Sequence, residues 1–294
     1  MVRKGSQLPP TIMRFDPIIK RDIKVSSRGP AFTALIMALN AVLGLVVLLG
    51  VFGRITGMNA VGRIDPGQLL KVYLTAAGVV LVFTVFVLPG RTTGSVTGER
   101  DSGTLDLMIA AGLTPAGIIE GKYLSALLFG SVAVFSCFPS LLIPLLYGGV
   151  GFSECLILMI SFIPTAALVL AIGVFASSDA RTSSSAAALG YGIIMALTAG
   201  PVLTAFLFRP IVSEGANYAA YSVILCPGIP AAVTALSQTG SREYIDMYFS
   251  YLGLVPNASF LSYITVISAA AELIMTVLFL VWAGYNITPR RRYR

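Results

Sequence analysis

Long apolar stretches alternate with short charged ones along the whole chain. A helix needs roughly 20 apolar residues to cross about 30 Å of hydrocarbon, and six stretches have this length with few or no charged residues. They predict membrane-spanning helices at about Ala31–Phe52, Leu69–Leu88, Tyr123–Tyr147, Cys155–Ala176, Ser185–Phe208 and Phe260–Tyr285. The pattern therefore predicts an all-α polytopic membrane protein in which residues 1–294 form one transmembrane domain.

A seventh stretch, Tyr218–Leu236, is apolar enough to span the membrane but is interrupted at its middle. Pro227, Gly228 and Pro230 lie too close together for a continuous helix. We therefore interpret this stretch as a re-entrant hairpin between the fifth and sixth spans. With six spans, 15 of the 20 lysines and arginines lie on the side of both termini. The positive-inside rule makes that side cytoplasmic, so we expect a multi-pass plasma (inner) membrane protein with both termini inside.

The segments outside the spans follow from this topology. We expect a cytoplasmic tail with an interfacial helix at 1–29, a cytoplasmic loop at 91–121, an outer region at 209–259 and a basic cytoplasmic tail at 286–294. The outer region holds five tyrosines: Tyr218, Tyr221, Tyr244, Tyr248 and Tyr251. Such rings anchor a chain at the membrane surface, or they line an outer gate, and both interpretations stay open.

Composition narrows the class of protein. Of 294 residues, 56% are hydrophobic and 11% charged, with a mean hydropathy of +0.86, whereas soluble domains carry about a quarter charged residues. The net charge of +7 comes from residues between apolar stretches, which argues against nucleic acid as a partner. The absence of histidine excludes a histidine general base and an H-E-x-x-H zinc site. Cys137, Cys155 and Cys226 lack C-x-x-C spacing and are interpreted as packing residues.

The segment before the first span has the pattern of a short amphipathic helix. Asp16 is a suitable N-cap and Pro17 a suitable first helical residue. Ile19 and Ile23 share one face, while Arg21 and its basic neighbours occupy the rest. We expect this helix to lie at the cytoplasmic membrane surface among the lipids. The alternative is a solvated basic tail attracted by anionic lipids.

The loop between the second and third spans carries the most informative motif. A charged cluster is followed by a short predicted helix with Leu105, Met108 and Ile109 on one face, which Gly112 can end. Thr114 then caps a new helix, with Pro115 at its first position. The loop is thus expected to hold a stiff short helix tied to two spans, which is what docking of a cytoplasmic protein requires.

The same residues carry a resemblance to a known family. The run Glu99-Arg100-Asp101-Ser102-Gly103-Thr104-Leu105-Asp106-Leu107, then Leu113-Thr114-Pro115 and Gly121-Lys122, resembles the coupling-helix signature of the type-2 ABC exporter permeases. The opening around Asp16-Pro17 and Arg21-Asp22 is similar to that family's interfacial helix, and the six-span layout agrees. The sequence departs from the family at Gly112, Gly117 and Glu120, and no contact is transferred to these positions.

The resemblance implies a permease whose loop docks on a separate ABC ATPase. The implied coupling residues are Glu99, Arg100, Asp101, Gly103, Thr104, Leu105, Met108, Thr114, Pro115, Gly121 and Lys122. Glu99 is expected to offer a carboxylate to the ATPase or to the loop's own base, Gly103 to allow close backbone approach, and Leu105 with Met108 to fill an apolar groove on the partner. A second permease copy or a paralogue is expected to complete the transporter.

The chain itself has no phosphate-binding loop, because Gly117–Lys122 fails the required spacing and lacks the final Ser or Thr. ATP and Mg²⁺ are therefore expected on the partner, and the chain alone is not expected to be an enzyme. The alternatives are an ion-gradient-driven secondary transporter and a membrane anchor for a cytoplasmic complex. A membrane-embedded hydrolase lacks paired carboxylates within the spans.

Two polar side chains inside the spans are candidates for a translocation path. Glu272 is the one charged residue within the sixth stretch, and a charge at that depth must face protein or water. It either faces a substrate cavity or pairs with a hydroxyl at a helix interface. Asn40 in the first span has the same two interpretations, and helix–helix hydrogen bonding is the favoured one.

The six-span topology predicts that the interrupted stretch does not cross the membrane. Epitope tags inserted near Asn217 and near Ser241 should therefore both be accessible from the outside of intact cells. Accessibility on opposite sides would establish a seventh span.

Overall fold

The computed structural model describes residues 24, 29–56, 66–146, 151–208, 226–239 and 258–287. Its helices are α2 (Pro30–Thr56), α3 (Pro66–Val82), α4 (Thr97–Asp101), α5 (Thr104–Ala110), α6 (Pro115–Ser136), α7 (Phe138–Leu146), α8 (Phe152–Asp179), α9 (Ser183–Phe208), α11 (Ile229–Gln238) and α13 (Ala258–Asn286). The described part of the chain contains no strand, and six of its helical segments are long and apolar enough to cross a membrane. The predicted all-α membrane fold is confirmed.

The spans agree with the sequence prediction except at their ends. The second continues past α3 through a π-helical turn (Phe83–Val87) and a 3-10 turn (Leu88–Arg91). The third begins earlier than predicted, at Pro115, because α6 extends well beyond its apolar part, and it bends into α7 at Cys137. The predicted interfacial helix, with Asp16, Pro17, Ile19, Arg21 and Ile23, lies outside the described residues, as do the five tyrosines of the outer region.

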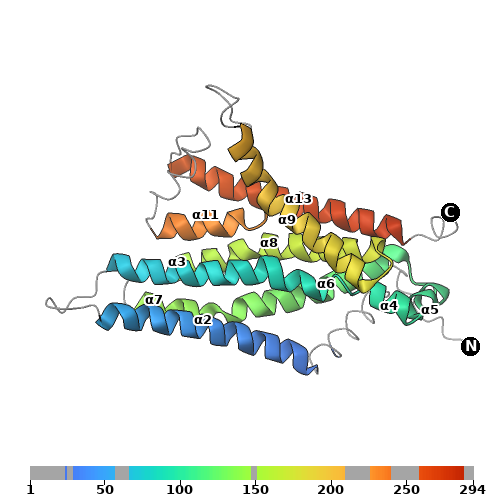
Figure 1. Ribbon diagram of the computed structural model, residues 1–294, viewed down its shortest axis with the longest axis horizontal. Coiled ribbons are helices and arrows are strands. Elements are labelled where there is room, and N and C mark those ends of the chain that lie inside the picture. The colour runs from blue at the N-terminus through green and yellow to red at the C-terminus, as the bar shows by residue number, and fades with distance from the viewer. Residues whose placement is uncertain are drawn as a thin grey trace, which may run out of the picture.

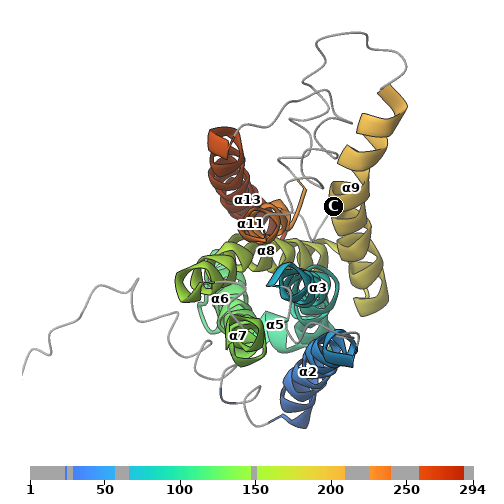
Figure 2. The same ribbon diagram turned by 90° about the vertical axis from the view of Figure 1, so that its left-hand side faces the viewer.

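Helix α8 is the centre of the bundle. It packs against α6, α7, α9, α11 and α13, and in Figure 2 it lies between α13 and α11 on one side and α3, α6 and α7 on the other. Every residue from Thr165 to Ser178 is buried. This segment is rich in small side chains, and small side chains allow helices to approach closely in an apolar medium.

Helices α2 and α13 lie at the edge of the bundle, with large apolar side chains exposed along them. Among the side chains of α13 that the structure describes, the exposed aromatic ones are Tyr263 toward one end and Trp282 and Tyr285 toward the other. Tyr263 and Trp282 are 19 residues apart, which is about 28 Å along a helix. This length matches the hydrocarbon thickness, and aromatic side chains favour both of its boundaries.

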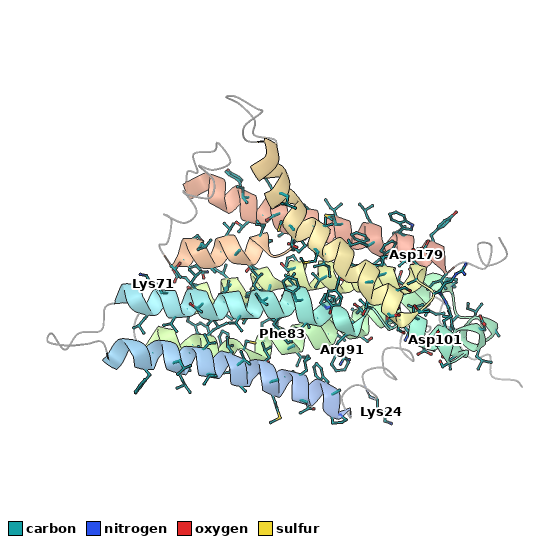
Figure 3. The ribbon with its side chains drawn as sticks, in the orientation of Figure 1. Lys24, Lys71, Phe83, Arg91, Asp101 and Asp179 are labelled. Atoms are coloured by element: carbon teal, nitrogen blue, oxygen red, sulfur yellow. The ribbon has the colours of Figure 1, made fainter. Side chains whose placement is uncertain are left out.

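The first and last described spans have their chain ends on the same side of the bundle. Figure 1 shows the start of α2 and the end of α13 toward the end of the molecule where α4 and α5 lie. An even number of spans requires this arrangement. Charged side chains gather at the two ends: Figure 3 shows Asp101 and Asp179 at the α4–α5 end and Lys71 at the other.

The turn after the second span packs tightly into the bundle at two glycines. Thr92 lies against Gly173 of α8, where an added Cβ would overlap the Thr92 Oγ1. Thr93 lies against Gly190 of α9, where an added Cβ would be 3.0 Å from the Thr93 Cγ2. These glycines let α8 and α9 close around the turn.

Replacing Gly173 by alanine should lower the melting temperature of the purified protein, because overpacking a tight contact costs roughly 1–3 kcal/mol. Gly192→Ala is the matched control, since no atom lies within 4 Å of its added Cβ and alanine stabilises a helix by about 0.5–1 kcal/mol over glycine. Thr92→Ala should restore much of the stability lost in Gly173→Ala. Equal melting temperatures for the two glycine variants would contradict this packing.

Candidate functional site

The segment Thr97–Leu113, here called the coupling loop, contains α4 and α5 and lies at one end of the bundle (Figure 1). It connects the second span to the third, with a turn at 92–96 before it and Thr114, the N-cap of α6, after it. Its position depends on contacts with the end of α8, the start of α9 and the start of α6.

The start of α4 is capped by a side chain from another helix. The Ser177 Oγ of α8 accepts hydrogen bonds from the Val96 and Thr97 backbone N–H groups at 2.9 and 3.0 Å. The Thr97 hydroxyl also lies 3.2 Å from the Ser183 Oγ at the start of α9. The first N–H groups of a helix have no partner within the helix itself. Here α8 supplies that partner, which ties the coupling loop to α8 and α9.

Arg100 binds the last carbonyls at the same end of α8. Its guanidinium donates hydrogen bonds to the Ala180 carbonyl at 2.6 Å and to the Ser178 carbonyl at 3.0 Å. The last carbonyls of a helix lack partners and carry partial negative charge, so a cation is stabilised there. Arg100 therefore acts as a C-terminal cap of α8, a role that the sequence did not indicate.

Glu99 and Lys122 join the coupling loop to α6. Lys122 Nζ lies 3.1 Å from Glu99 Oε1, and both side chains are largely buried. The Thr104 hydroxyl at the start of α5 donates to the same carboxylate. The expectation that the Glu99 carboxylate serves the loop's own base is confirmed. Gly121, adjacent to Lys122, is buried at this junction.

The connection between α5 and α6 has the predicted form. Gly112 has a φ of 81°, its N–H donates to the Ile109 carbonyl, and the Leu113 N–H donates to the Met108 carbonyl. This is a Schellman motif, which satisfies the last carbonyls of α5. Thr114 then caps α6, accepting from the Gly117 N–H at 3.2 Å, and Pro115 is the first helical residue. Both predictions are confirmed.

The interpretation of Leu105 as a partner-facing side chain is wrong. Leu105 is 1% exposed and packs in a cluster with Val96, Ile118 and Ile119, and Met108 is partly buried against the same cluster. The apolar face of α5 packs into a cluster with side chains of the chain's own α6, α8 and α13, because an amphipathic helix buries its apolar face against the nearest apolar surface. Gly103 has a φ of 71° and no atom within 4 Å of an added Cβ, so close approach of a partner at Gly103 stays a prediction.

The surface that the coupling loop does present was not predicted. Leu107, on the opposite face of α5, is 69% exposed, and the exposed acidic residues nearest to it along the chain are Asp106, Asp101 and Glu120. The helical period contains this information, since residue 107 lies away from 105, 108 and 109. The helical period does not show which of the two faces of α5 packs against the rest of the chain.

The two polar candidates within the spans both act as links between helices. Asn40 Nδ2 donates to the Ser136 Oγ at 2.9 Å and to the Ile36 carbonyl, which joins α2 to α6. Glu272 is fully buried, accepting from the Gly228 N–H at 2.9 Å and from the Thr165 hydroxyl at 3.2 Å. The interpretation that each bonds at a helix interface is confirmed. Among the described residues, no group of three His, Cys, Asp or Glu side chains could hold a metal ion.

Comparisons with known proteins do not assign this chain to a family. No family model matches the sequence, and no curated protein is detectably similar to it.

Arg100 should contribute more to the order of the coupling loop than its neighbour Asp101, which is exposed. Arg100→Ala leaves two α8 carbonyls without their charged donor, and a hydrogen bond to a charged group contributes about 1.5–3 kcal/mol. Hydrogen exchange of the 97–113 amides should therefore accelerate in Arg100→Ala, by tenfold or more. Asp101→Ala should leave exchange within about threefold of wild type, because an exposed charge contributes little. Similar exchange in both variants would show that Arg100 does not hold the loop.

Proposed function

We propose that this chain is the membrane-spanning permease subunit of an ATP-driven ABC transporter that works as an exporter. In this proposal the coupling loop docks on a separate ABC ATPase dimer, and a second permease chain completes the transporter. ATP and Mg²⁺ bind to the ATPase. The membrane is the plasma (inner) membrane, and the α4–α5 end with both termini faces the cytoplasm.

The observation that carries the proposal is the attachment of the coupling loop. Through Ser177 and Arg100 it is bonded to the end of α8, and through the Glu99–Lys122 pair to the start of α6. The turn before it packs tightly against α8 and α9 through Thr92 and Thr93. A force applied to the coupling loop would therefore reach α6, the central helix α8 and the second span together. This linkage is what coupling of nucleotide hydrolysis to a change between two transport states requires.

The resemblance in the sequence points to the same segment. The run from Glu99 to Leu107 resembles a coupling helix, and the structure gives this segment an exposed leucine with carboxylates nearby in sequence. Interfaces are often dominated by a few side chains that fill pockets on the partner, surrounded by polar contacts. Leu107 is the side chain of the coupling loop best placed for that role, in place of Leu105.

The test is association with an ATPase encoded by a neighbouring reading frame that carries a phosphate-binding loop. Leu107→Ala should weaken co-purification of the two chains by about tenfold, because truncating a central interface residue often costs more than 1 kcal/mol. Its melting temperature should stay at the wild-type value, since the Leu107 side chain is exposed. Substrate-stimulated ATP hydrolysis by the complex should fall in parallel.

Two control variants separate docking from folding. Leu105→Ala should lower the melting temperature by removing a buried side chain, which typically costs 2–5 kcal/mol. Glu120→Gln removes an exposed carboxylate and should change association by less than about threefold. Wild-type association and hydrolysis in Leu107→Ala would mean that the coupling loop is not the docking element. If the wild-type chain binds no ATPase, the ion-gradient transporter or the membrane anchor becomes the better proposal.

A further inference from the structure

Helix α11 crosses only half of the bundle. At its C-terminal end, here called the outer end, the Gln238 side chain donates to the Glu154 carbonyl at 2.8 Å and accepts from the Tyr73 hydroxyl at 3.0 Å. At its N-terminal end, here called the inner end, the Gly228 N–H donates a hydrogen bond to the Glu272 carboxylate, which also accepts one from the Thr165 hydroxyl. Glu154 lies in the first turn of α8 and Thr165 at its midpoint. The 10-residue helix α11 thus covers one half of α8, a length of about 15 Å.

The inner end of α11 is enclosed by three spans. Glu272 comes from α13, Thr165 from α8 and Leu81 from α3, and a Cβ on Gly228 would lie 2.6 Å from the Leu81 Cδ1. Gly228 also has a φ of 90°, so this position requires glycine on both counts. Figure 2 shows α11 directly beside α13 and over α8.

Glu272 holds the inner end of α11 by a polar contact in an apolar environment. Its carboxylate is fully buried, and the described residues include no lysine or arginine in a salt bridge with it. The Gly228 N–H that it accepts belongs to the N-terminus of α11, where the helix dipole favours a negative group. The Thr165 hydroxyl adds a second bond to the same carboxylate.

The buried face of α11 consists of small side chains packed against α8, α13 and α3. Its buried side chains are Pro230, Ala231, Val233, Thr234 and Ala235. In an apolar medium, helices associate through van der Waals packing and interhelical hydrogen bonds, and small side chains allow close approach. The hydrogen bonds at its two ends add directional contacts to this packing and fix where α11 lies along α8.

We propose that α11 is a movable plug in its half of the bundle and that Glu272 is the latch that holds its inner end. Breaking the bond between the Glu272 carboxylate and the Gly228 N–H releases the inner end of α11 from α8 and α13. The large spans keep their positions, because they pack against one another through α8. This inference does not depend on an ATPase partner, since it concerns contacts within the chain alone.

The experiment measures exposure of α11 in proteoliposomes. Cys137, Cys155 and Cys226 are replaced by alanine, and Ala231→Cys is introduced as a reporter, because Ala231 is 1% exposed beside the latch. The rate of maleimide labelling should rise tenfold or more when Glu272→Ala is added. Glu272→Gln keeps an oxygen that accepts from Gly228 and should stay within about threefold of the parent. Thr165→Val should give an intermediate rate.

A second reporter distinguishes release of α11 from general loosening. Ala133→Cys lies in α6, is fully buried, and should label at the same slow rate in every latch variant. A rise at both reporters would contradict the latch, as would unchanged labelling of Ala231→Cys in Glu272→Ala. If Glu272→Ala does not fold, the comparison is made with Thr165→Val, which removes only a hydroxyl. Unchanged labelling of Ala231→Cys in that variant overturns the proposal.

Discussion

The rest of the structure depends on α8, a buried central helix whose polar side chains lie mostly near its ends. Between Thr165 and Ser178 every residue of α8 is buried, and five other helices pack against α8. In hydrocarbon, backbone groups must bond within the helix, and the unsatisfied groups at helix ends need partners from elsewhere. At the end of α8 that partner is Arg100, and Ser177 in its last turns serves α4 in return. The central helix and the coupling loop therefore each supply hydrogen-bond partners for a helix end of the other.

Polar contacts in this bundle sit where chain segments must be positioned rather than where the core is made. Asn40 joins α2 to α6, and Glu272 joins α11 to α8 and α13. The core itself consists of aliphatic and aromatic side chains with small residues between them. An interhelical hydrogen bond in an apolar medium is directional and is either formed or broken. Segments held by such bonds can adopt discrete positions.

The spans could be read from the sequence because their signal is simply length without charge. The caps at Gly112, Thr114 and Pro115 were predictable too, since local backbone geometry dictates those residue types. The roles of Arg100 and Leu105 were not, because both depend on which segment folds against α5. Arg100 has the sequence pattern of an exposed charge, and its carbonyl partners lie about 80 residues further along the chain. Contacts between residues so far apart produce no periodic pattern in the sequence.

The spacing of the aromatic side chains on α13 indicates the thickness of the bilayer that suits this helix. Tyr263 and Trp282 mark a stretch of 19 residues, or about 28 Å, which is close to the thinner biological membranes and short of the roughly 32–33 Å of sterol-rich ones. In a thicker bilayer these rings would be drawn into hydrocarbon, or the lipid would have to thin around the helix. Hydrophobic mismatch of this kind costs a fraction of a kcal/mol for each ångström. The sixth span thus favours one range of membrane thickness, whatever the function of the chain.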